Sequence, residues 1–233
     1  MTQKIVVFGS NSDIAKSFIQ KAREENYSIF TISRKDDSNY LVEDISSFEQ
    51  VENAMQAAIE NLGEINGVVN FCGSILLRSA HLTSFDDYMQ TINSSLTTSF
   101  AITRATAKFV KNNCSVVFIG SAAAKIGLAN HEAIAAAKGG VIALAKSASA
   151  TYASKGIRFN VINPGLVDTK LTSKIIQNQE SLKYSLSMHA SERPGCVQDI
   201  SSMVMFLLKP ENNWITGSNF DIDGGLVNIK IKK

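Results

Sequence analysis

Short apolar runs alternate with helical patterns along the chain. Residues 4–8 form a compact apolar run followed by small polar residues, which is typical of a strand buried on both faces. Apolar side chains then recur at helical spacing from Ile14 to Ala22, and residues 28–32 form the next apolar run. This order predicts a strand–helix–strand unit at the start of the chain.

The same alternation continues to the end of the sequence. Further helices are expected over residues 48–62, 85–111, 131–153 and 197–208, and further strands over 67–71, 115–119, 156–162 and 219–222. Residues 169–190 are polar and only weakly periodic. Alternating strands and helices predict an α/β fold, a Rossmann-type doubly wound parallel sheet in a three-layer α/β/α arrangement. No linker or repeat divides it, so we expect a single domain over residues 1–233.

Length and charge narrow the class of protein. The chain has 233 residues, of which 45% are hydrophobic, and a net charge of +2. A domain of this length buries enough surface to fold without disulfides. The small net charge indicates neither a nucleic acid nor a membrane partner. The sequence shows no signal-peptide core and no apolar run long enough to span a bilayer, so we expect a cytoplasmic protein.

The cysteines carry little information about function. Cys72, Cys114 and Cys196 are widely spaced and form no C-x-x-C pair. This spacing suggests neither a zinc site nor a disulfide framework. We expect buried free thiols and no metal site.

The turn after the first strand is the first place to look for a ligand, because ligands of a doubly wound sheet bind at the carboxyl ends of its strands. Residues 9–13 are small or polar and lead into a helix. Backbone N–H groups and the helix dipole could receive a pyrophosphate there. An ordinary strand–helix turn with a Ser or Asp cap would have the same composition.

This turn resembles the G-x-x-x-G-I-G element of short-chain dehydrogenases/reductases. Gly9 and Ile14 match, whereas Asp13 and Ala15 stand where the family usually has glycine. Ala15 still permits close packing of the helix on the strand. A carboxylate at position 13 would repel a pyrophosphate unless it points away.

Further elements of the family pattern follow in order along the whole chain. Asp44-Ile45 resembles the adenine contact, Asn70 to Gly73 the N-N-A-G strand end, and Asn93 the active-site Asn. Residues 157–169 resemble the segment that closes over nicotinamide, and residues 214–225 resemble the family's C-terminal ending. By this order and spacing the chain is identified as a member of the family. The resemblance implies cofactor contacts from Gly9, Ser10, Asn11, Ser12, Ile14, Ser33, Arg34, Asp44, Ile45, Asn70, Cys72, Gly73, Lys138, Pro164, Gly165, Val167 and Thr169.

The end of the second strand distinguishes NAD from NADP. A carboxylate there holds the ribose 2′-OH, whereas a nearby Arg accommodates a 2′-phosphate. This chain has Ser33, Arg34 and Lys35 and no acid at that end. We therefore expect NADP(H) in preference to NAD(H), because Arg binds phosphate with two hydrogen bonds and Lys adds a charge. A solvated basic turn is the alternative, since Asp36 and Asp37 follow directly.

The resemblance also implies a catalytic set with a gap. The family uses a Tyr to transfer a proton, a Lys one helical turn later to assist it, and a Ser to position the substrate oxygen. Ser121 and Lys138 match the Ser and the Lys, and Asn93 completes the set. The position four residues before Lys138 is Ile134, which cannot transfer a proton.

Three interpretations of the missing Tyr are open. His131, on the same helix face as Ile134 and Lys138, could act as the acid or base, as could His189 from the other side. Alternatively, Ser121 or water relays the proton and turnover is slow. In the third interpretation the protein binds a nucleotide without redox catalysis.

We therefore expect an NADP(H)-dependent oxidoreductase that acts on a carbonyl or alcohol substrate. The alternative is a non-catalytic nucleotide-binding or regulatory protein, which would have less use for Ser121 and Asn93. Residues 172–193 should cover the substrate, and their polarity favours a small or polar compound, with Tyr184, Met188 and His189 as contacts. The resemblance also implies a homo-oligomer, a dimer or tetramer formed by packing of the long helices.

Overall fold

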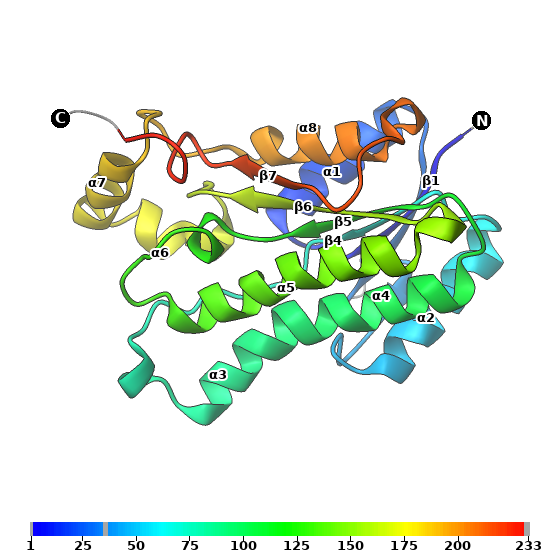
Figure 1. Ribbon diagram of the computed structural model, residues 1–233, viewed down its shortest axis with the longest axis horizontal. Coiled ribbons are helices and arrows are strands. Elements are labelled where there is room, and N and C mark those ends of the chain that lie inside the picture. The colour runs from blue at the N-terminus through cyan, green and yellow to red at the C-terminus, as the bar shows by residue number, and fades with distance from the viewer. Residues whose placement is uncertain (1, 35–36, 231–233) are drawn as a thin grey trace.

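Seven parallel strands form one sheet in the order β3-β2-β1-β4-β5-β6-β7 (Figure 1). The computed structural model describes residues 2–34 and 37–230, so Lys35 and Asp36 of the expected basic turn lie outside the described residues. The strand order reverses between β1 and β4, which defines the topological switch point of a doubly wound sheet. The Rossmann-type α/β prediction is confirmed.

The element bounds follow the alternation expected from the sequence. The strands are β1 (Lys4–Phe8), β2 (Ser28–Ser33), β3 (Tyr40–Leu41), β4 (Gly67–Asn70), β5 (Ser115–Ile119), β6 (Arg158–Pro164) and β7 (Asn219–Ile222). The α-helices are α1 (Asp13–Glu24), α2 (Phe48–Leu62), α3 (Phe85–Ile92), α4 (Thr98–Phe109), α5 (Glu132–Thr151), α6 (Ser173–Ile176), α7 (Gln179–Met188) and α8 (Val197–Leu208). A π-helical turn, η2 (Asn93–Thr97), joins α3 to α4, and short 3₁₀ turns are η1 (Ala80–Leu82), η3 (Ala122–Ala124), η4 (Ala153–Lys155), η5 (Lys170–Thr172) and η6 (Pro210–Asn212).

Strand β1 shows why residues 5–8 include no polar position. Its side chains alternate between the two faces of the sheet: Val6 and Phe8 join the core beneath α2, α4 and α5, and Ile5 and Val7 join the core beneath α1 and α8 (Figure 1). All four are fully buried. A strand covered on both faces therefore reads as a continuous apolar run.

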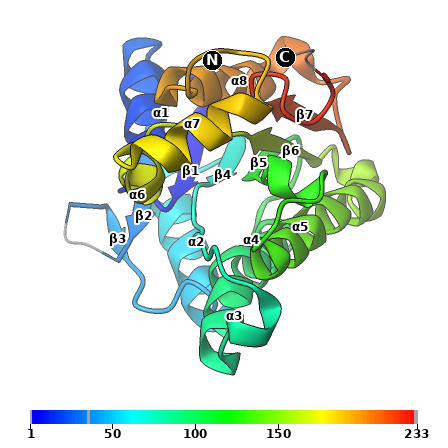
Figure 2. The same ribbon diagram turned by 90° about the vertical axis from the view of Figure 1, so that its left-hand side faces the viewer.

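The carboxyl ends of the strands all point to one side of the molecule. Figure 2 looks onto that side, where α6 and α7 lie near the strand ends and α3 lies across from them. Helices α6 and α7 contain no fully buried residue. The weak periodicity of residues 169–190 has this cause, since the segment lies beside an opening rather than packing on the sheet.

The expected long helix over residues 85–111 is interrupted. The N–H of Thr98 donates to the carbonyl oxygen of Asn93, five residues earlier, and its hydroxyl donates to the same oxygen at 2.7 Å. The side chain of Asn93 accepts from the Thr97 hydroxyl at 3.0 Å. These contacts make the π turn, a feature that often marks functional sites.

Three smaller expectations are corrected by the structure. The strand expected over residues 156–162 begins at Arg158, because Gly156 has a φ of +65° and ends the preceding turn. Helix α5 begins at Glu132 rather than at His131. Cys196 is exposed at the start of α8, whereas Cys114 is buried and Cys72 is partly buried. No helix among the described residues is long and apolar enough to cross a membrane.

We expect Phe159→Ala to destabilise the protein by about 3–5 kcal/mol, because it leaves a cavity in the core. Phe159 is fully buried in β6, and its ring centroid lies 6.1 Å from those of both Phe118 and Tyr152. Phe85→Ala is the control, since Phe85 is 74% exposed. Urea unfolding measures both, and equal losses in the two variants would contradict this account of the core.

Candidate active site

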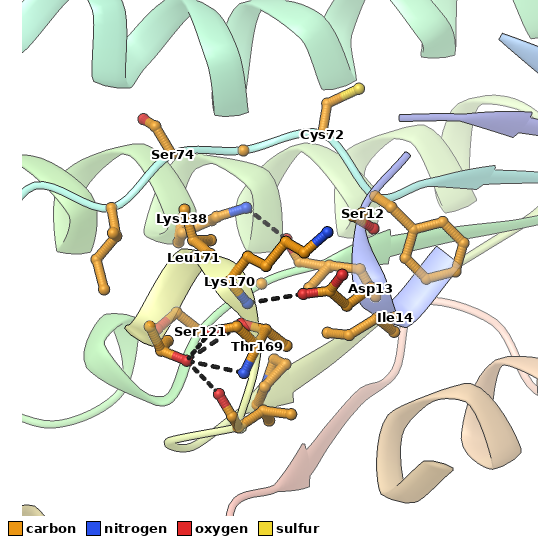
Figure 3. A pocket seen from close by; sticks show the side chains of 18 of the residues that line it. Ser12, Asp13, Ile14, Cys72, Ser74, Ser121, Lys138, Thr169, Lys170 and Leu171 are labelled. Carbon is orange, nitrogen blue, oxygen red and sulfur yellow. Dashed lines mark hydrogen bonds between the residues drawn. The ribbon is translucent and has the colours of Figure 1, made fainter. Parts of the chain in front are cut away.

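A cavity of about 490 Å³ lies at the carboxyl ends of β1, β4, β5 and β6 (Figure 3). We call it the inner cavity. Five segments supply its walls: residues 11–14, 71–75, 119–121, 134–138 and 164–172. It therefore lies at the switch point of the sheet, where open α/β folds bind ligands.

The turn after β1 approaches the end of β4 very closely. Gly9 has a φ of +73°, and a Cβ there would lie 2.9 Å from both the backbone nitrogen and the sulfur of Cys72. Only glycine fits this position. The Ser12 hydroxyl accepts a hydrogen bond from the backbone N–H of Ala15 at 3.1 Å and caps α1. The N–H groups of the first helical turn, at Asp13 and Ile14, have no partner within the helix and can receive an anion.

The carboxylate of Asp13 has a backbone partner. Its Oδ2 accepts a hydrogen bond of 2.7 Å from the N–H of Lys170, which follows β6 (Figure 3). The carboxylate thus turns toward the segment that covers the cavity. It joins the turn after β1 to residues 170–172, which line the same cavity.

A second cavity of about 490 Å³ continues the first, and we call it the outer cavity. The two share lining residues in the turn after β1 and at the end of β4, so they form one groove across the switch point; these residues are Asn11, Ser12, Phe71, Cys72, Gly73 and Ser74. The outer cavity adds Ser33 and Arg34 at the end of β2, Asp44 and Ile45 before α2, and Asn93 in the π turn. Asn11 donates to the Ser33 hydroxyl at 2.8 Å and joins the first two strand ends.

Most of the residues expected to contact a cofactor line this groove. Ser10 and Asn70 line neither cavity, although both are buried. Ser10 lies 3.4 Å from the carbonyl oxygen of Ile32, to which its hydroxyl donates. Asn70 donates to the Ser99 hydroxyl at 3.1 Å and accepts from the N–H of Cys72 at 2.9 Å. These two side chains therefore stabilise the strand ends through hydrogen bonds within the protein and do not line the groove.

Lys138 on α5 brings a cation to the inner cavity. Its side chain is buried, and Nζ donates to the carbonyl oxygen of Ile119 at 2.8 Å (Figure 3). Desolvation lowers the pKa of Lys138 to about 8, against a smaller opposing effect of Cys72. Burial raises the pKa of Cys72 to about 12, so this thiol stays protonated at neutral pH.

A third cavity, of about 380 Å³, adjoins the inner one, and we call it the apolar cavity. Ser121 and Ile134 line both, as do Ile75, Pro164, Gly165 and Thr172. Tyr184, Met188 and His189 line the apolar cavity, as residues 172–193 led us to expect. Its walls are nevertheless mainly aliphatic, in contrast to the polar character of that segment. Sequence reasoning missed Ile75, Leu77, Leu128, Ile175 and Leu226, which come from separate segments.

The junction of these two cavities is the chemically important point. The Ser121 oxygen accepts a hydrogen bond of 3.1 Å from the N–H of Ala123, which fixes its place. Ile134 is 5% exposed and presents an apolar side chain where the family resemblance calls for Tyr. His131 lines the apolar cavity but not the inner one, and its Nδ1 lies 2.7 Å from the carbonyl oxygen of Ala129.

The ring of His189 makes hydrogen bonds with the backbone. It is buried, its Nδ1 lies 2.7 Å from the carbonyl oxygen of Ser185, and its Nε2 accepts from the N–H of Leu166 at 3.4 Å. Because both ring nitrogens are engaged, His189 is poorly placed to exchange protons with a ligand. Across residues 2–34 and 37–230, no His, Cys, Asp and Glu side chains gather in a group that could hold a metal ion.

Comparison with known proteins agrees with this geometry. The family model described as Enoyl-(Acyl carrier protein) reductase matches residues 13–227, nearly the whole chain. The chain belongs to the short-chain dehydrogenase/reductase family. The expected resemblance is thereby confirmed, and the family is one of oxidoreductases.

Several dehydrogenases/reductases share the sequence and the fold. The trans-4-hydroxycyclohexanecarboxylate dehydrogenase of Sinomonas cyclohexanicum is 32% identical over 183 residues, which cover 78% of this chain and 68% of that enzyme. The 3-oxoacyl-(acyl carrier protein) reductase MabA of Mycobacterium avium is 26% identical over 234 residues, which cover 97% of this chain and 90% of MabA. The solved structure of ElxO with NADP bound has the same fold, with a TM-score of 0.90 at 23% identity over 98% of this chain and 100% of ElxO.

The buried Lys138 of this dehydrogenase/reductase should make stability depend on pH. Its pKa is about 8 in the folded protein against 10.5 for an ordinary lysine. Below pH 8 the lysine is charged in both states, so the full destabilisation from burying the charge is present. Between these values the unfolded state binds more protons and the wild type gains stability as the pH rises. We therefore compare the free energy of unfolding of Lys138→Met with that of the wild type. This difference should favour the variant by about 2–3 kcal/mol more at pH 7 than at pH 10.

Urea unfolding without nucleotide at the two pH values tests this expectation. Lys146→Met, at an exposed position on the same helix, sets the baseline for removal of a lysine from α5. A difference between Lys138→Met and wild type that is the same at pH 7 and pH 10 would contradict a depressed Lys138 pKa.

Proposed function

We propose that the protein is an NADP(H)-dependent oxidoreductase that interconverts a carbonyl and an alcohol without the family's Tyr. The observation that supports this proposal best is the junction of the inner and apolar cavities at Ser121 and Ile134. A protein that only binds a nucleotide needs the groove but has no need of a second, apolar cavity beside it. The bound nicotinamide would supply or accept the hydride.

The groove fits a dinucleotide. Gly9 leaves room for a close backbone approach, and the first turn of α1 offers unpaired N–H groups for a pyrophosphate. Lys138 presents a buried cation in the inner cavity, suited to ribose hydroxyls. Pro164 and Thr169 line the same cavity on the side where the resemblance places nicotinamide.

The outer cavity favours NADP(H) over NAD(H). Arg34 is exposed and lines it beside Ser33, so its guanidinium is available to a 2′-phosphate. Glu43 and Asp44 line the same cavity, but Asp44 accepts from the N–H and hydroxyl of Ser46 at 2.9 and 2.6 Å. The bound NADP in the structural relative ElxO agrees with this preference.

Ser121 is the residue best placed to contact the substrate oxygen, because it lines both cavities. Its oxygen accepts from Ala123, which leaves the hydroxyl hydrogen to donate toward the junction. The proton would come from His131, which lines the same apolar cavity, or from water through Ser121. Either route replaces a Tyr and should limit the rate.

A nucleotide-binding protein without redox activity is the second candidate. The observation that favours it is Ile134, because an apolar side chain fills the place of the proton donor at the junction. In that case Lys138 and the groove serve binding alone. The two candidates differ in whether supplying a proton donor at this position produces turnover.

We expect NADPH to bind more tightly than NADH, and Arg34→Ala to weaken NADPH binding about 10- to 100-fold with little effect on NADH, since one charge-assisted phosphate contact is lost. Titration followed by the fluorescence of the reduced nicotinamide measures both. Arg23→Ala, an exposed Arg in the last turn of α1, is the matched control. Equal affinities for the two nucleotides, or an equal effect of both variants on NADPH affinity, would contradict the proposed phosphate contact.

We expect Ile134→Tyr to raise the rate of carbonyl reduction by about 10²- to 10⁴-fold, because it supplies a proton donor four residues before Lys138. Ile134→Phe, with the same ring and no hydroxyl, should leave the rate near that of the wild type. Steady-state oxidation of NADPH over a panel of ketones and aldehydes measures the rate. If all three proteins bind NADPH and none turns over, the non-catalytic candidate replaces the oxidoreductase.

A further inference from the structure

Charged side chains are unevenly distributed over the three cavities. The inner cavity is lined by Asp13, Lys138 and Lys170, and the outer one by Arg34, Glu43 and Asp44. Among the described residues that line the apolar cavity there is no Asp, Glu, Lys or Arg. Ionic groups thus occur along the nucleotide groove and stop at the junction.

Three of the polar side chains that line the apolar cavity make hydrogen bonds within the protein. The Thr172 hydroxyl donates to the carbonyl oxygen of Val167 at 2.5 Å. Both ring nitrogens of His189 are engaged, and the Asn130 side chain accepts from the Ser79 hydroxyl at 2.5 Å. An ion that entered would lose its hydration and meet no Asp, Glu, Lys or Arg side chain among the described lining residues, which is unfavourable.

Ile134 extends this apolar character to the reacting corner. The side chain lines both cavities, and it joins a wall made by Ile75, Leu128, Ile175 and Met188. Ser121 is then the hydrogen-bond donor available at the junction. A ligand there has one place for an oxygen and an aliphatic surface around the rest.

The apolar character of the cavity extends to the protein surface. Leu77 and Tyr184 line the cavity and are 41% and 67% exposed, so apolar surface reaches the solvent. A volume of about 380 Å³ is near the lower end of the roughly 300–1,000 Å³ of small-molecule sites, which indicates a compact ligand.

We propose that the substrate is an uncharged, compact, mainly aliphatic ketone or alcohol, with its body in the apolar cavity and its oxygen at Ser121. This inference rests on the proposed function. Of the small or polar compound expected from the sequence, it keeps the small size and favours an aliphatic body over a polar one. It sets Leu128 and Met188 among the residues that determine specificity. Each additional buried methylene should improve affinity about fourfold until the cavity is full.

A matched pair of cyclohexanones tests the proposal: 4-oxocyclohexanecarboxylate and its methyl ester share the ring and differ in charge. We expect the protein to bind the ester at least about a hundredfold more tightly than the acid, because no Lys or Arg among the described lining residues could pair with the carboxylate. Calorimetric titration with and without saturating NADPH measures binding independently of turnover. Acid binding equal to or tighter than ester binding, or no binding of either at millimolar concentration, would overturn the proposal.

A pair of variants locates the effect. Leu128→Arg puts a cation on the wall of the apolar cavity and should shift the preference toward the acid by at least about tenfold. Leu82→Arg, at a position that is 64% exposed and not part of that wall, should leave the preference unchanged. A failure of NADPH to bind would contradict the proposed function, whereas ester binding without turnover would leave the substrate class standing and place the fault in catalysis.

Discussion

Gly9 lies closer to the end of β4 than any side chain would allow, and the arrangement of the site follows from that approach. The missing Cβ lets the turn after β1 rest against Cys72, so that α1 starts directly over the switch point of the sheet. The N-terminus of α1 then faces the groove formed by the inner and outer cavities. Any larger residue would push the turn outward and would also be strained at a φ of +73°.

The groove and the apolar cavity separate two kinds of chemistry within one strand-end surface. Charges line the groove, where a dinucleotide would need them, and aliphatic groups line the adjoining cavity. Ile134 stands at the boundary between them. Under the proposed function, its presence would change proton transfer and ligand recognition together, because one residue belongs to both walls. The Ile at this position would then affect specificity as well as rate.

The sequence predicted the parts of this molecule that are set by burial. β1, α8 and β7 have the expected bounds, because their periodicities record which faces are covered. The positions of Ser121 and Lys138 at one cavity follow from the parallel sheet, which brings strand ends together. The sequence did not predict local polar contacts. The π turn depends on hydrogen bonds that Thr97 and Thr98 make with Asn93, which leave no trace in a hydrophobic pattern.

The apolar cavity was hidden for a different reason. Its aliphatic residues are single positions in segments far apart in the chain, from Ile75 to Leu226, and no local periodicity connects them. Within residues 169–190 such a residue stands among polar neighbours, so the average character of the segment concealed Ile175. The composition of a segment averages over all its residues, whereas only those on one face line a binding site.

The bond between Asp13 and the N–H of Lys170 has a consequence for both cavities. One continuous segment, residues 170–188, lines the inner cavity at its start and the apolar cavity along the rest of its length. A ligand that displaced this segment at one cavity would therefore move a wall of the other. Any coupling that arose in this way would be reciprocal, so that each ligand would change the affinity of the other by the same factor.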